Sequence, residues 1–297
     1  MAPADSARIG LHSVGLSGVR KPLRVDRPDR AVVLSVEFDL AVNLPADRKG
    51  SDLSRNSELL AEIVDRTAQR PVASLEAACA DIARELLTRH PTARRSSVQA
   101  RAEYFLRKGP TPGRSSLEAY TLFAEAEGTR GPGGAVGVTA SVGAEAVGMT
   151  ACPCAMETCR ELLLREYPLL ADPSLESLPM ITHNQRNRTR LLFEMPEGCA
   201  TEVDRMLAAI EAAQSAETFD ILKRGDEASV VVRAHRNPKF VEDVLRSLLA
   251  GLPGRFPELP DSVGIRAQTV SEESIHKYNV VAAHRTTLGE LRRSGPA

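Results

Sequence analysis

The sequence predicts an α+β fold whose sheet is largely antiparallel. Stretches rich in β-branched residues with partial alternation indicate strands at many points of the 297-residue chain. Apolar residues at helical spacing indicate helices between them. The two patterns do not alternate one by one, as they would around a parallel sheet, so we expect strands joined by pairs of helices. A chain of this length suffices for one large domain or two medium ones.

The first half of the chain is predicted to begin with an arm. Residues 1–30, rich in Pro, Gly, Ser and Arg, are expected to be flexible or loosely docked. The β-branched content of residues 31–45 predicts the first strand. Helical spacing predicts two helices, with Ser74 as the cap of the second, over residues 57–68 and 75–89. Three further strands are predicted, over residues 99–108, 119–128 and 135–148.

The second half is predicted to repeat this mixture. We expect helices near residues 157–167, 201–216 and 238–251. We expect strands near residues 189–195, 228–234, 262–271 and 278–286. The last of the helices has the clearest signals, because Asn237 can cap it and Pro238 suits its first turn.

Composition excludes several classes of function. Lys plus Arg is 38 and Asp plus Glu is 39, so nothing favours binding to nucleic acid or to a membrane surface. Trp is absent and aromatic residues are few, which argues against a platform for stacking bases. No apolar stretch approaches the roughly 18 residues of a membrane span, and no secretory signal is expected. The odd count of five cysteines predicts reduced thiols in the cytoplasm.

Four residues of the types that bind metals lie in four separate segments of unusual composition. They are Cys152, His183, Glu227 and His276. A thiolate, two imidazoles and a carboxylate suit a borderline transition metal. Because the segments are far apart in the sequence, they form one site only if the fold gathers them. A metal site that keeps an open position can activate water for catalysis.

Each segment also has an ordinary structural interpretation. The polar stretch that contains His183 can be a solvated loop. Cys152 and Cys154 can be two small buried thiols beside a proline turn. Glu227, predicted in a turn before a strand, can be simply exposed. His276 is predicted to share one side of a strand with Tyr278, where it can face a cleft or be a satisfied core histidine.

Basic side chains near these segments are candidates for contacts to an anion. Arg186, Arg188 and Arg190 alternate along a predicted strand. Alternating residues point the same way, so the three form either an anion-binding face or an ordinary charged outer face. Lys223 and Arg224 precede Glu227 and are reasonable partners for phosphate groups.

Glu242 lies near the border of the apolar stripe of its predicted helix. A carboxylate that enters a pocket there needs paired N–H donors, such as the N1–H and 2-amino group of guanine. The alternative is a surface carboxylate favoured by the helix dipole. The common templates are absent, because the sequence has no GxGxxG signature, Walker A motif, GxSxG or HExxH.

Taken in order, these segments resemble the GTP cyclohydrolase type IB and archaeal-type (MptA) family. The matching stretches are GMTACPCA (148–155), THNQR (182–186), ILKRGDE (221–227), NPKFVEDVLR (237–246) and ESIH (273–276). The resemblance extends from roughly residue 30 to residue 290. The long interval between Cys152 and His183 is similar to the archaeal, iron-dependent branch.

The resemblance implies a tunnelling fold (T-fold), with antiparallel sheets and helices on one face. It implies two modules per chain, here residues 31–150 and 151–297, the second with most of the metal site. It also implies a homotetramer with active sites at subunit interfaces. The metal ligands would be Cys152, His183, Glu227 and His276, with Fe²⁺ expected and Mn²⁺ or Zn²⁺ as alternatives.

The implied activity is metal-dependent hydrolytic opening of the guanine imidazole ring of GTP. Formate leaves, and the product is 7,8-dihydroneopterin triphosphate or its 2′,3′-cyclic phosphate, used for pterin or folate synthesis. The expected catalytic residues are Cys152, His183, His276 and Tyr278. The expected substrate-binding residues are Glu242, which matches the guanine anchor of the family, and Arg55, Arg186, Arg188, Lys223 and Arg224.

Two positions depart from the family pattern. Tyr278 stands where the family usually has a second histidine. In the stretch Gly50–Arg55, Asp52 replaces another histidine, although Ser54 and Arg55 remain. Two alternatives therefore stay open. One is the same chemistry on another guanine nucleotide in a specialised pathway, and the other is a catalytically silent homologue that binds nucleotide.

Overall fold

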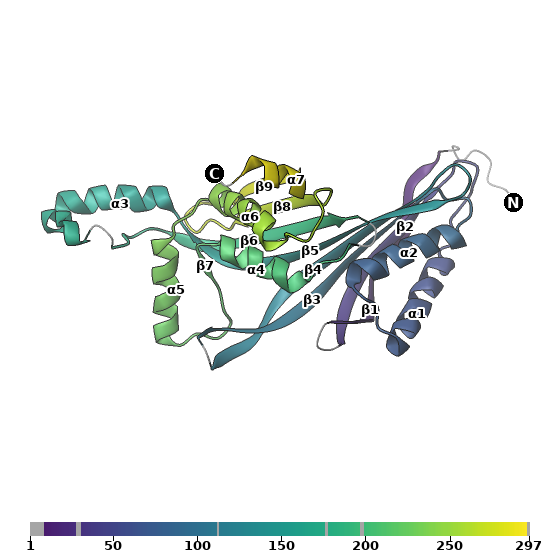
Figure 1. Cartoon of the computed structure of the whole chain (residues 1–297), viewed down its shortest axis with the longest axis horizontal. Helices are drawn as coiled ribbons and strands as arrows, with labels where there is room; N and C mark the ends of the chain where they lie inside the picture. The colour runs from purple at the N-terminus through teal and green to yellow at the C-terminus, as the bar shows by residue number, and fades with distance from the viewer. Residues whose placement is uncertain (1–8, 28–30, 112, 176–177, 197–198, 296–297) are drawn as a thin grey trace. The chain divides into compact units, whose positions relative to one another are not determined.

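A computed structural model describes residues 9–27, 31–111, 113–175, 178–196 and 199–295 (Figure 1). The chain divides into two compact units. Unit 1 comprises the described residues within 1–104, 121–142 and 194–199. Unit 2 comprises those within 105–120, 143–193 and 200–297. In the described part of the chain, the strand order is β1-β2-β3-β4-β5-β6-β8-β9, with β7 paired to β5.

The elements follow one another along the chain, and strands β3 to β6 each contribute to both units. The strands are β1 (Leu11–Val25), β2 (Val32–Leu44), β3 (Arg95–Thr111), β4 (Arg114–Arg130), β5 (Val136–Ala151), β6 (Asn184–Met195), β7 (Ala216–Glu217), β8 (Gly264–Ser271) and β9 (Val280–Thr287). The helices are α1 (Ser54–Gln69), α2 (Leu75–Arg89), α3 (Pro153–Glu166), α4 (Val203–Ala213), α5 (Arg224–Arg236), α6 (Val241–Arg255) and α7 (Leu288–Ser294). Two short 3₁₀ turns follow α3, at Pro168–Ala171 and Pro173–Leu175.

In unit 1, helices α1 and α2 pack against β1 and β2. Alternate residues of the unit 1 part of β3, such as Val98, Ala100 and Ala102, are buried, and the residues between them are exposed. This period of two follows from the pleat of a strand with one covered face. Ser74 caps α2 by accepting a hydrogen bond from the Ala77 N–H, as the sequence predicts.

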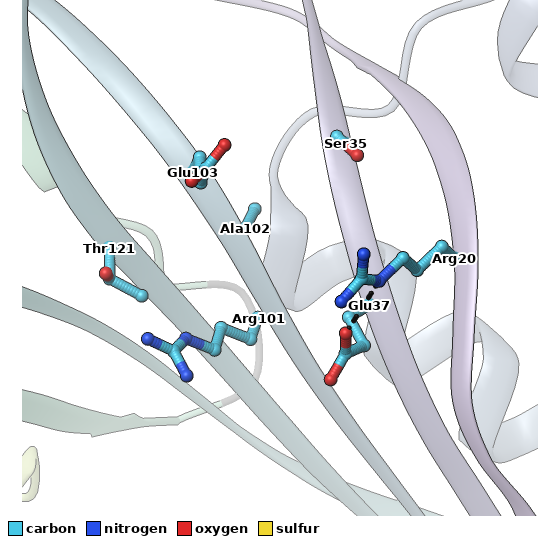
Figure 2. Close-up of a pocket in the computed structure, with 7 residues that line it drawn as sticks. All are labelled: Arg20, Ser35, Glu37, Arg101, Ala102, Glu103 and Thr121. Atoms are coloured by element: carbon cyan, nitrogen blue, oxygen red, sulfur yellow. Dashed lines mark hydrogen bonds and ion pairs between the residues drawn. The ribbon is translucent and has the colours of Figure 1, made fainter.

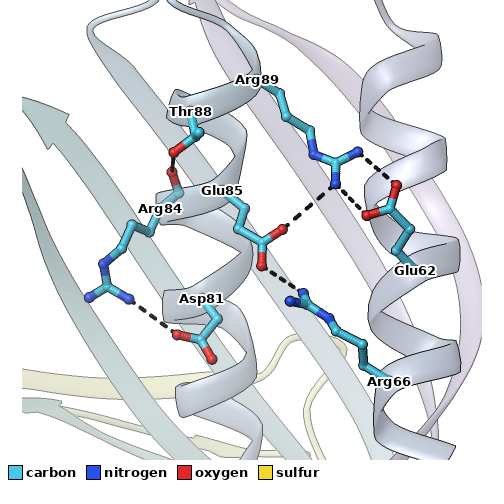
Figure 3. Close-up of polar contacts among 7 residues, drawn as sticks. All are labelled: Glu62, Arg66, Asp81, Arg84, Glu85, Thr88 and Arg89. Carbon is cyan, nitrogen blue, oxygen red and sulfur yellow. Dashed lines mark hydrogen bonds and ion pairs between the residues drawn. The ribbon is translucent and has the colours of Figure 1, made fainter.

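The outer surface of the α1–α2 pair carries an ion-pair network (Figure 3). Arg89 on α2 donates to both carboxylate oxygens of Glu62 on α1, at 2.5 and 3.2 Å. Arg66 on α1 donates to Glu85 on α2 at 2.6 Å. These contacts link the two helices where their side chains leave the core, although exposed pairs of this kind contribute little each.

In unit 2, helices α4 and α6 pack on each other, and α6 packs on β8. The apolar stripe of α6, which includes Val244, Leu248 and Leu252, is buried. Phe193 of β6 meets Phe256 edge to face, with ring centroids 5.0 Å apart. The α+β fold with an antiparallel sheet is therefore confirmed.

The predicted arm is wrong for residues 11–25, which form β1 and pair antiparallel with β2. Leu23 and Val25 of β1 are buried, so this strand is part of the core of unit 1. Gly18 adopts a φ of +70° beside a register shift, a conformation that favours glycine. The composition of residues 11–25 does not indicate a strand. The segment is a strand because it pairs with β2, which lies beyond residue 30. Residues 1–8 and 28–30 of the predicted arm lie outside the described residues.

Three predictions for the second half are also wrong. Helix α6 begins at Val241 rather than at Pro238, and Asn237 lies at the C-terminal end of α5 instead of capping α6. Residues 228–234 form part of helix α5, not a strand. Val230 and Ala234, four residues apart, share the buried side of α5 and pack with Met149, Phe219 and Leu222. Residues 272–279 form a loop between β8 and β9, so the segment that contains His276 and Tyr278 is not a strand. No described helix is long and apolar enough to cross a membrane.

Candidate active site

Cys152 and His183 lie next to each other, although 30 residues separate them in the sequence. Cys152 follows the last residue of β5 and caps α3, where its sulfur accepts the Ala155 N–H at 3.5 Å. Its own N–H donates to the His183 carbonyl oxygen at 3.1 Å, and the Thr182 hydroxyl donates to the Cys152 carbonyl oxygen at 2.7 Å. These two bonds join the two ends of the segment between Cys152 and His183, and they hold the backbones of the two predicted ligands side by side.

The imidazole of His183 is largely buried and oriented by polar neighbours. Its side chain is 13% exposed. Its Nδ1 lies 2.8 Å from Oε1 of Gln185 and 3.9 Å from a carboxylate oxygen of Glu273. With Nδ1 engaged in this way, Nε2 is the nitrogen available to an external ligand.

Glu273 is a residue of this site that the sequence reasoning missed as a functional residue. It follows the end of β8, and its side chain is 10% exposed. One of its oxygens accepts a hydrogen bond from the Ser271 hydroxyl at 2.7 Å and lies 3.5 Å from Nε2 of Gln185. The available signal was the first letter of the ESIH motif, which places a carboxylate three residues before His276. A nearly buried carboxylate beside an imidazole is a frequent feature of catalytic sites.

The other two predicted ligands, Glu227 and His276, are exposed. Glu227 lies in the first turn of α5, and His276 lies in the loop after β8, where its ring stacks on Tyr278 with centroids 5.1 Å apart. Within the part of the chain that the structure describes, no group of three or more His, Cys, Asp or Glu side chains is arranged to hold a metal ion. Cys152 and His183 are therefore the two predicted ligands that hydrogen bonds join, and the four-ligand site stays a prediction.

The start of α5 is fixed by Asp226, the neighbour of Glu227. Its carboxylate accepts the Lys223 N–H at 3.0 Å and pairs with Arg114 from the β3–β4 hairpin. The accepted backbone hydrogen bond, together with the Arg114 guanidinium, holds the pKa of Asp226 below its usual value. The two contacts of the Asp226 carboxylate, with the Lys223 N–H and with Arg114, act as a clamp. This clamp sets the direction of the turn that carries Lys223, Arg224 and Glu227.

A pocket of about 360 Å³ lies in unit 1, on β1, β2, β3 and β4 (Figure 2). It is lined by Arg20, Ser35, Glu37, Arg101, Ala102, Glu103 and Thr121. Arg20 and Glu37 form an ion pair at 2.9 Å across the strands. None of the predicted site residues lines this pocket, so its size alone does not mark it as the place of the chemistry.

The sequence matches a known family along nearly its whole length. The model of the family described as type I GTP cyclohydrolase folE2 matches residues 2–282. The chain belongs to this family of enzymes. The family predicted from the sequence is therefore confirmed.

Curated relatives cover the same extent. The GTP cyclohydrolase MptA of Methanococcoides burtonii is 40% identical over 292 residues, which is 96% of this chain and 92% of the relative. The GTP cyclohydrolase MptA of Methanosarcina acetivorans is 39% identical over 301 residues, 98% of this chain and 95% of the relative. Both similarities span the two units of this cyclohydrolase-family chain.

Among solved structures, the fold is similar to that of a uricase from Bacillus fastidious. The TM-score is 0.54 at 12% sequence identity, with 95% of each chain covered. At this identity the likeness shows the fold alone. Family membership therefore comes from the sequence, and the solved structure supports the α+β architecture.

The predicted substrate-binding residues of unit 2 lie on exposed positions of this cyclohydrolase-family chain. Arg186 and Arg188 alternate on the exposed side of β6, as predicted. Arg188 pairs with Glu145 at 3.0 Å and with Glu272 at 3.4 Å, and the hydrogen bond to Glu145 raises its pKa. Glu242 is exposed in the first turn of α6. None of these observations yet assigns a contact with substrate, so the roles stay predictions.

Arg55, in unit 1, is held by contacts with nearby residues of the same unit. Its guanidinium donates to the Arg89 carbonyl oxygen at 2.8 Å and lies 3.0 Å from the carboxylate of Asp52. Asp52, at the position where the resemblance predicts a histidine, thus gives the arginine an acidic partner. Burial and the nearby Arg55 lower the pKa of His90, whose Nε2 lies 2.7 Å from Oδ1 of buried Asn56.

Proposed function

We propose that this protein is a GTP cyclohydrolase that opens the imidazole ring of guanine and releases formate. The product is 7,8-dihydroneopterin triphosphate or its 2′,3′-cyclic phosphate, for pterin or folate synthesis. The observation that carries the proposal is the hydrogen-bonded juxtaposition of Cys152 and His183 with Gln185 and Glu273 nearby, in a chain of the cyclohydrolase family. Distant motifs of the sequence meet there at one place.

The donor chemistry supports a divalent transition metal, with Fe²⁺ as the first choice and Mn²⁺ or Zn²⁺ as alternatives. The half-buried Cys152 sulfur and the available Nε2 of His183 suit such an ion. Glu227 and His276, on exposed segments of the same unit, would complete the ligand set. When bound, the ion lowers the pKa of the water that attacks C8 of guanine.

The side chains of the protein supply binding and proton transfer. Glu242 holds the base through the guanine N1–H and 2-amino group, which fixes C8 for attack. Glu273, beside His183, is suited to accept a proton, and the hydroxyl of Tyr278 is suited to return one as formate leaves. Positive charge for the phosphates comes from Arg55, Arg186, Arg188, Lys223 and Arg224.

We further propose the tunnelling fold with two modules per chain. Two successive sets of elements have the same order, two strands, two main helices and two strands. The first set runs from β1 to β4, and the second comprises β5, β6, α4, α6, β8 and β9. This order supports a module boundary before β5, whereas the boundary at residue 150 that the sequence predicts would leave β5 in the first module.

A homotetramer with active sites between subunits is part of the proposal. Helix α3 buries none of its described side chains, and Leu162, Tyr167, Leu169 and Ile181 are exposed on and after it. A 14-residue helix gains little stability in isolation, so this apolar surface favours a protein partner. Exposed Glu227 and His276 can then meet the other ligands at an interface. The five free cysteines suit the cytoplasm.

The direct test uses full-length protein purified without oxygen, then incubated with GTP and Fe²⁺. We expect formate and a fluorescent pterin. Cys152→Ala and His183→Ala should each remove bound metal and turnover, whereas Cys199→Ala should change neither, because this thiol belongs to no predicted motif. A folded, metal-loaded protein that releases no formate from GTP would reject the proposed activity.

The second candidate is the same reaction on another guanine nucleotide. The contact of Arg55 with Asp52 favours this second candidate, because it engages a side chain that is predicted to bind a phosphate group of the substrate. Turnover should be compared among GTP, GDP and GMP at equal concentration. Faster turnover of GDP or GMP would support this candidate, and nucleotide binding without formate release would instead indicate a silent homologue.

A further inference from the structure

Gln185 sits between three groups of unit 2 that lie on or next to three neighbouring strands. It points to the buried side of β6 and is 9% exposed. Its Nε2 lies 3.2 Å from the hydroxyl of Thr150 on β5 and 3.5 Å from the carboxylate of Glu273, which follows β8. Its Oε1 lies 2.8 Å from Nδ1 of His183. The amide therefore connects one imidazole to one carboxylate.

The carboxylate of Glu273 decides which way this amide points. An ionised carboxylate only accepts hydrogen bonds, so the –NH₂ end of Gln185 must face it. The flipped amide would bring Oε1 against a carboxylate oxygen, with two acceptors facing each other. Glu273 is itself held by the Ser271 hydroxyl at 2.7 Å, and the hydroxyl of Thr150 adds a second acceptor for the –NH₂ end.

The direction of the amide in turn decides the tautomer of His183. An amide oxygen only accepts, so Nδ1 of the neutral imidazole must carry the proton that it donates to Gln185. Nε2 then keeps its lone pair. Without this acceptor, a neutral imidazole favours the Nε2–H form in water, which cannot bind a metal through Nε2.

We propose that Gln185 is a positioning residue that holds His183 in the Nδ1–H tautomer, so that Nε2 is ready to bind a metal. The chain of hydrogen bonds runs from Ser271 through Glu273 and Gln185 to His183. This inference deepens the proposed cyclohydrolase function and rests on it for the identity of the ligand. The tautomer itself is a property of the protein without metal, and it can be measured without any substrate.

The first experiment is a ¹H–¹⁵N correlation spectrum of metal-free, ¹⁵N-histidine-labelled protein at alkaline pH, where imidazoles are neutral. The chain has six histidines, and the signal of His183 is assigned by its loss in His183→Gln. We expect the pattern of the Nδ1–H tautomer in the native chain. An Nε2–H pattern for His183 in the native chain would overturn the proposal.

The second experiment compares Gln185→Met with the control Gln268→Met. Met matches the size of Gln but provides no strong acceptor, and Gln268 is exposed on β8. We expect Gln185→Met to shift His183 toward Nε2–H and to weaken Zn²⁺ binding by about 10- to 100-fold, with the control unchanged. Thr150→Val, which loosens the amide without touching His183, should have a smaller effect of the same sign.

The outcomes separate this inference from the proposed function. If Gln185→Met folds and leaves both the tautomer and the Zn²⁺ affinity unchanged, Gln185 does not position His183. If Gln185→Met does not fold, the spectrum of the native chain decides, and an Nε2–H pattern for His183 rejects the proposal. If the spectra and affinities change as expected while GTP gives no formate, the positioning role of Gln185 is supported and the proposed cyclohydrolase activity is rejected.

Discussion

Glu211 shows how unit 2 accommodates a buried carboxylate. It lies on α4 and is 6% exposed. Lys108 pairs with one of its oxygens, and the Tyr120 hydroxyl donates to the other at 2.6 Å. Burial, reinforced by the adjacent Glu211, raises the pKa of Tyr120. The three residues join the β3–β4 hairpin to α4, and the buried Glu211 carboxylate has a partner for each of its two oxygens.

Glu211→Ala should destabilise the protein strongly, because it leaves Lys108 and Tyr120 without their buried partner. Removal of one partner of a buried pair costs about 3–5 kcal/mol of unfolding free energy. Urea unfolding followed by circular dichroism measures the change. Glu161→Ala, on the exposed surface of α3, should stay within about 0.5 kcal/mol of the native value. Equal effects of the two variants would contradict the argument.

His90 should make the protein less stable in mild acid. Burial and the nearby Arg55 lower its pKa in the folded state from the ordinary 6.5. The unfolded chain then takes up a proton that the folded chain does not, so this contribution to stability is full above pH 6.5 and is lost as pH falls through the lowered folded-state pKa. Unfolding free energies measured from neutral to mildly acidic pH should decline less steeply in His90→Gln. An identical decline in both proteins would show that other groups cause it.

At the scale of elements, α5 is the clearest case of local pattern overruled by tertiary context. The run Ala228–Ala234 contains three consecutive valines, which favour a strand in isolation. The bond from the Lys223 N–H to Asp226 begins a helix instead, and Val230 and Ala234 bury one side of it. The clamp from Arg114 secures the same turn.

Asp226→Asn should loosen the first turn of α5, because the neutral amide weakens both the cap and the pair with Arg114. Backbone amides of residues 225–228 should exchange with solvent roughly fivefold faster, as expected for a weakened N-cap. Hydrogen exchange followed by mass spectrometry measures this. Asp220→Asn, at an exposed position just before α5, is the control and should leave the exchange unchanged. Unaltered protection in Asp226→Asn would exclude a clamp at this turn.

At the scale of the whole molecule, the exposed apolar side chains of α3 and of the segment after it form the proposed surface for assembly with other subunits. Leu162 is 57% exposed and Leu169 is 89% exposed. Both residues lie in the segment between Cys152 and His183. Hydrogen bonds from Cys152 to His183 and from Thr182 to Cys152 join the two ends of this segment. Assembly through this surface would therefore be connected directly to the candidate active site.

Leu162→Glu should weaken assembly, since a charge placed in an apolar interface must lose its water. Size-exclusion chromatography with light scattering should show native chains as tetramers and the variant as smaller species at the same concentration. Glu157→Gln changes the charge of the same helix by one unit at a polar, exposed position and should stay tetrameric. A native chain that is monomeric at all concentrations would refute the proposed assembly.

The sequence by itself determined the family, through the order of its motifs, and most of the elements. Helix α2 begins after its Ser74 cap and ends as predicted, and α6 buries the stripe read from its leucines and valines. These features depend on residues a few positions apart, which a sequence displays directly. By contrast, the strand β1 and the helical state of residues 228–234 depend on partners distant in the chain.

Only the tertiary structure decided how the candidate site is supported. Thr150, Gln185 and Glu273 lie on or next to β5, β6 and β8, which are consecutive in the sheet but far apart in the sequence. Their hydrogen bonds fix the imidazole of His183, and no spacing in the chain reveals them. A motif shows which atoms are available for chemistry, whereas strand pairing sets which of those atoms meet, because hydrogen bonds act over a few ångströms of space whatever the separation in sequence.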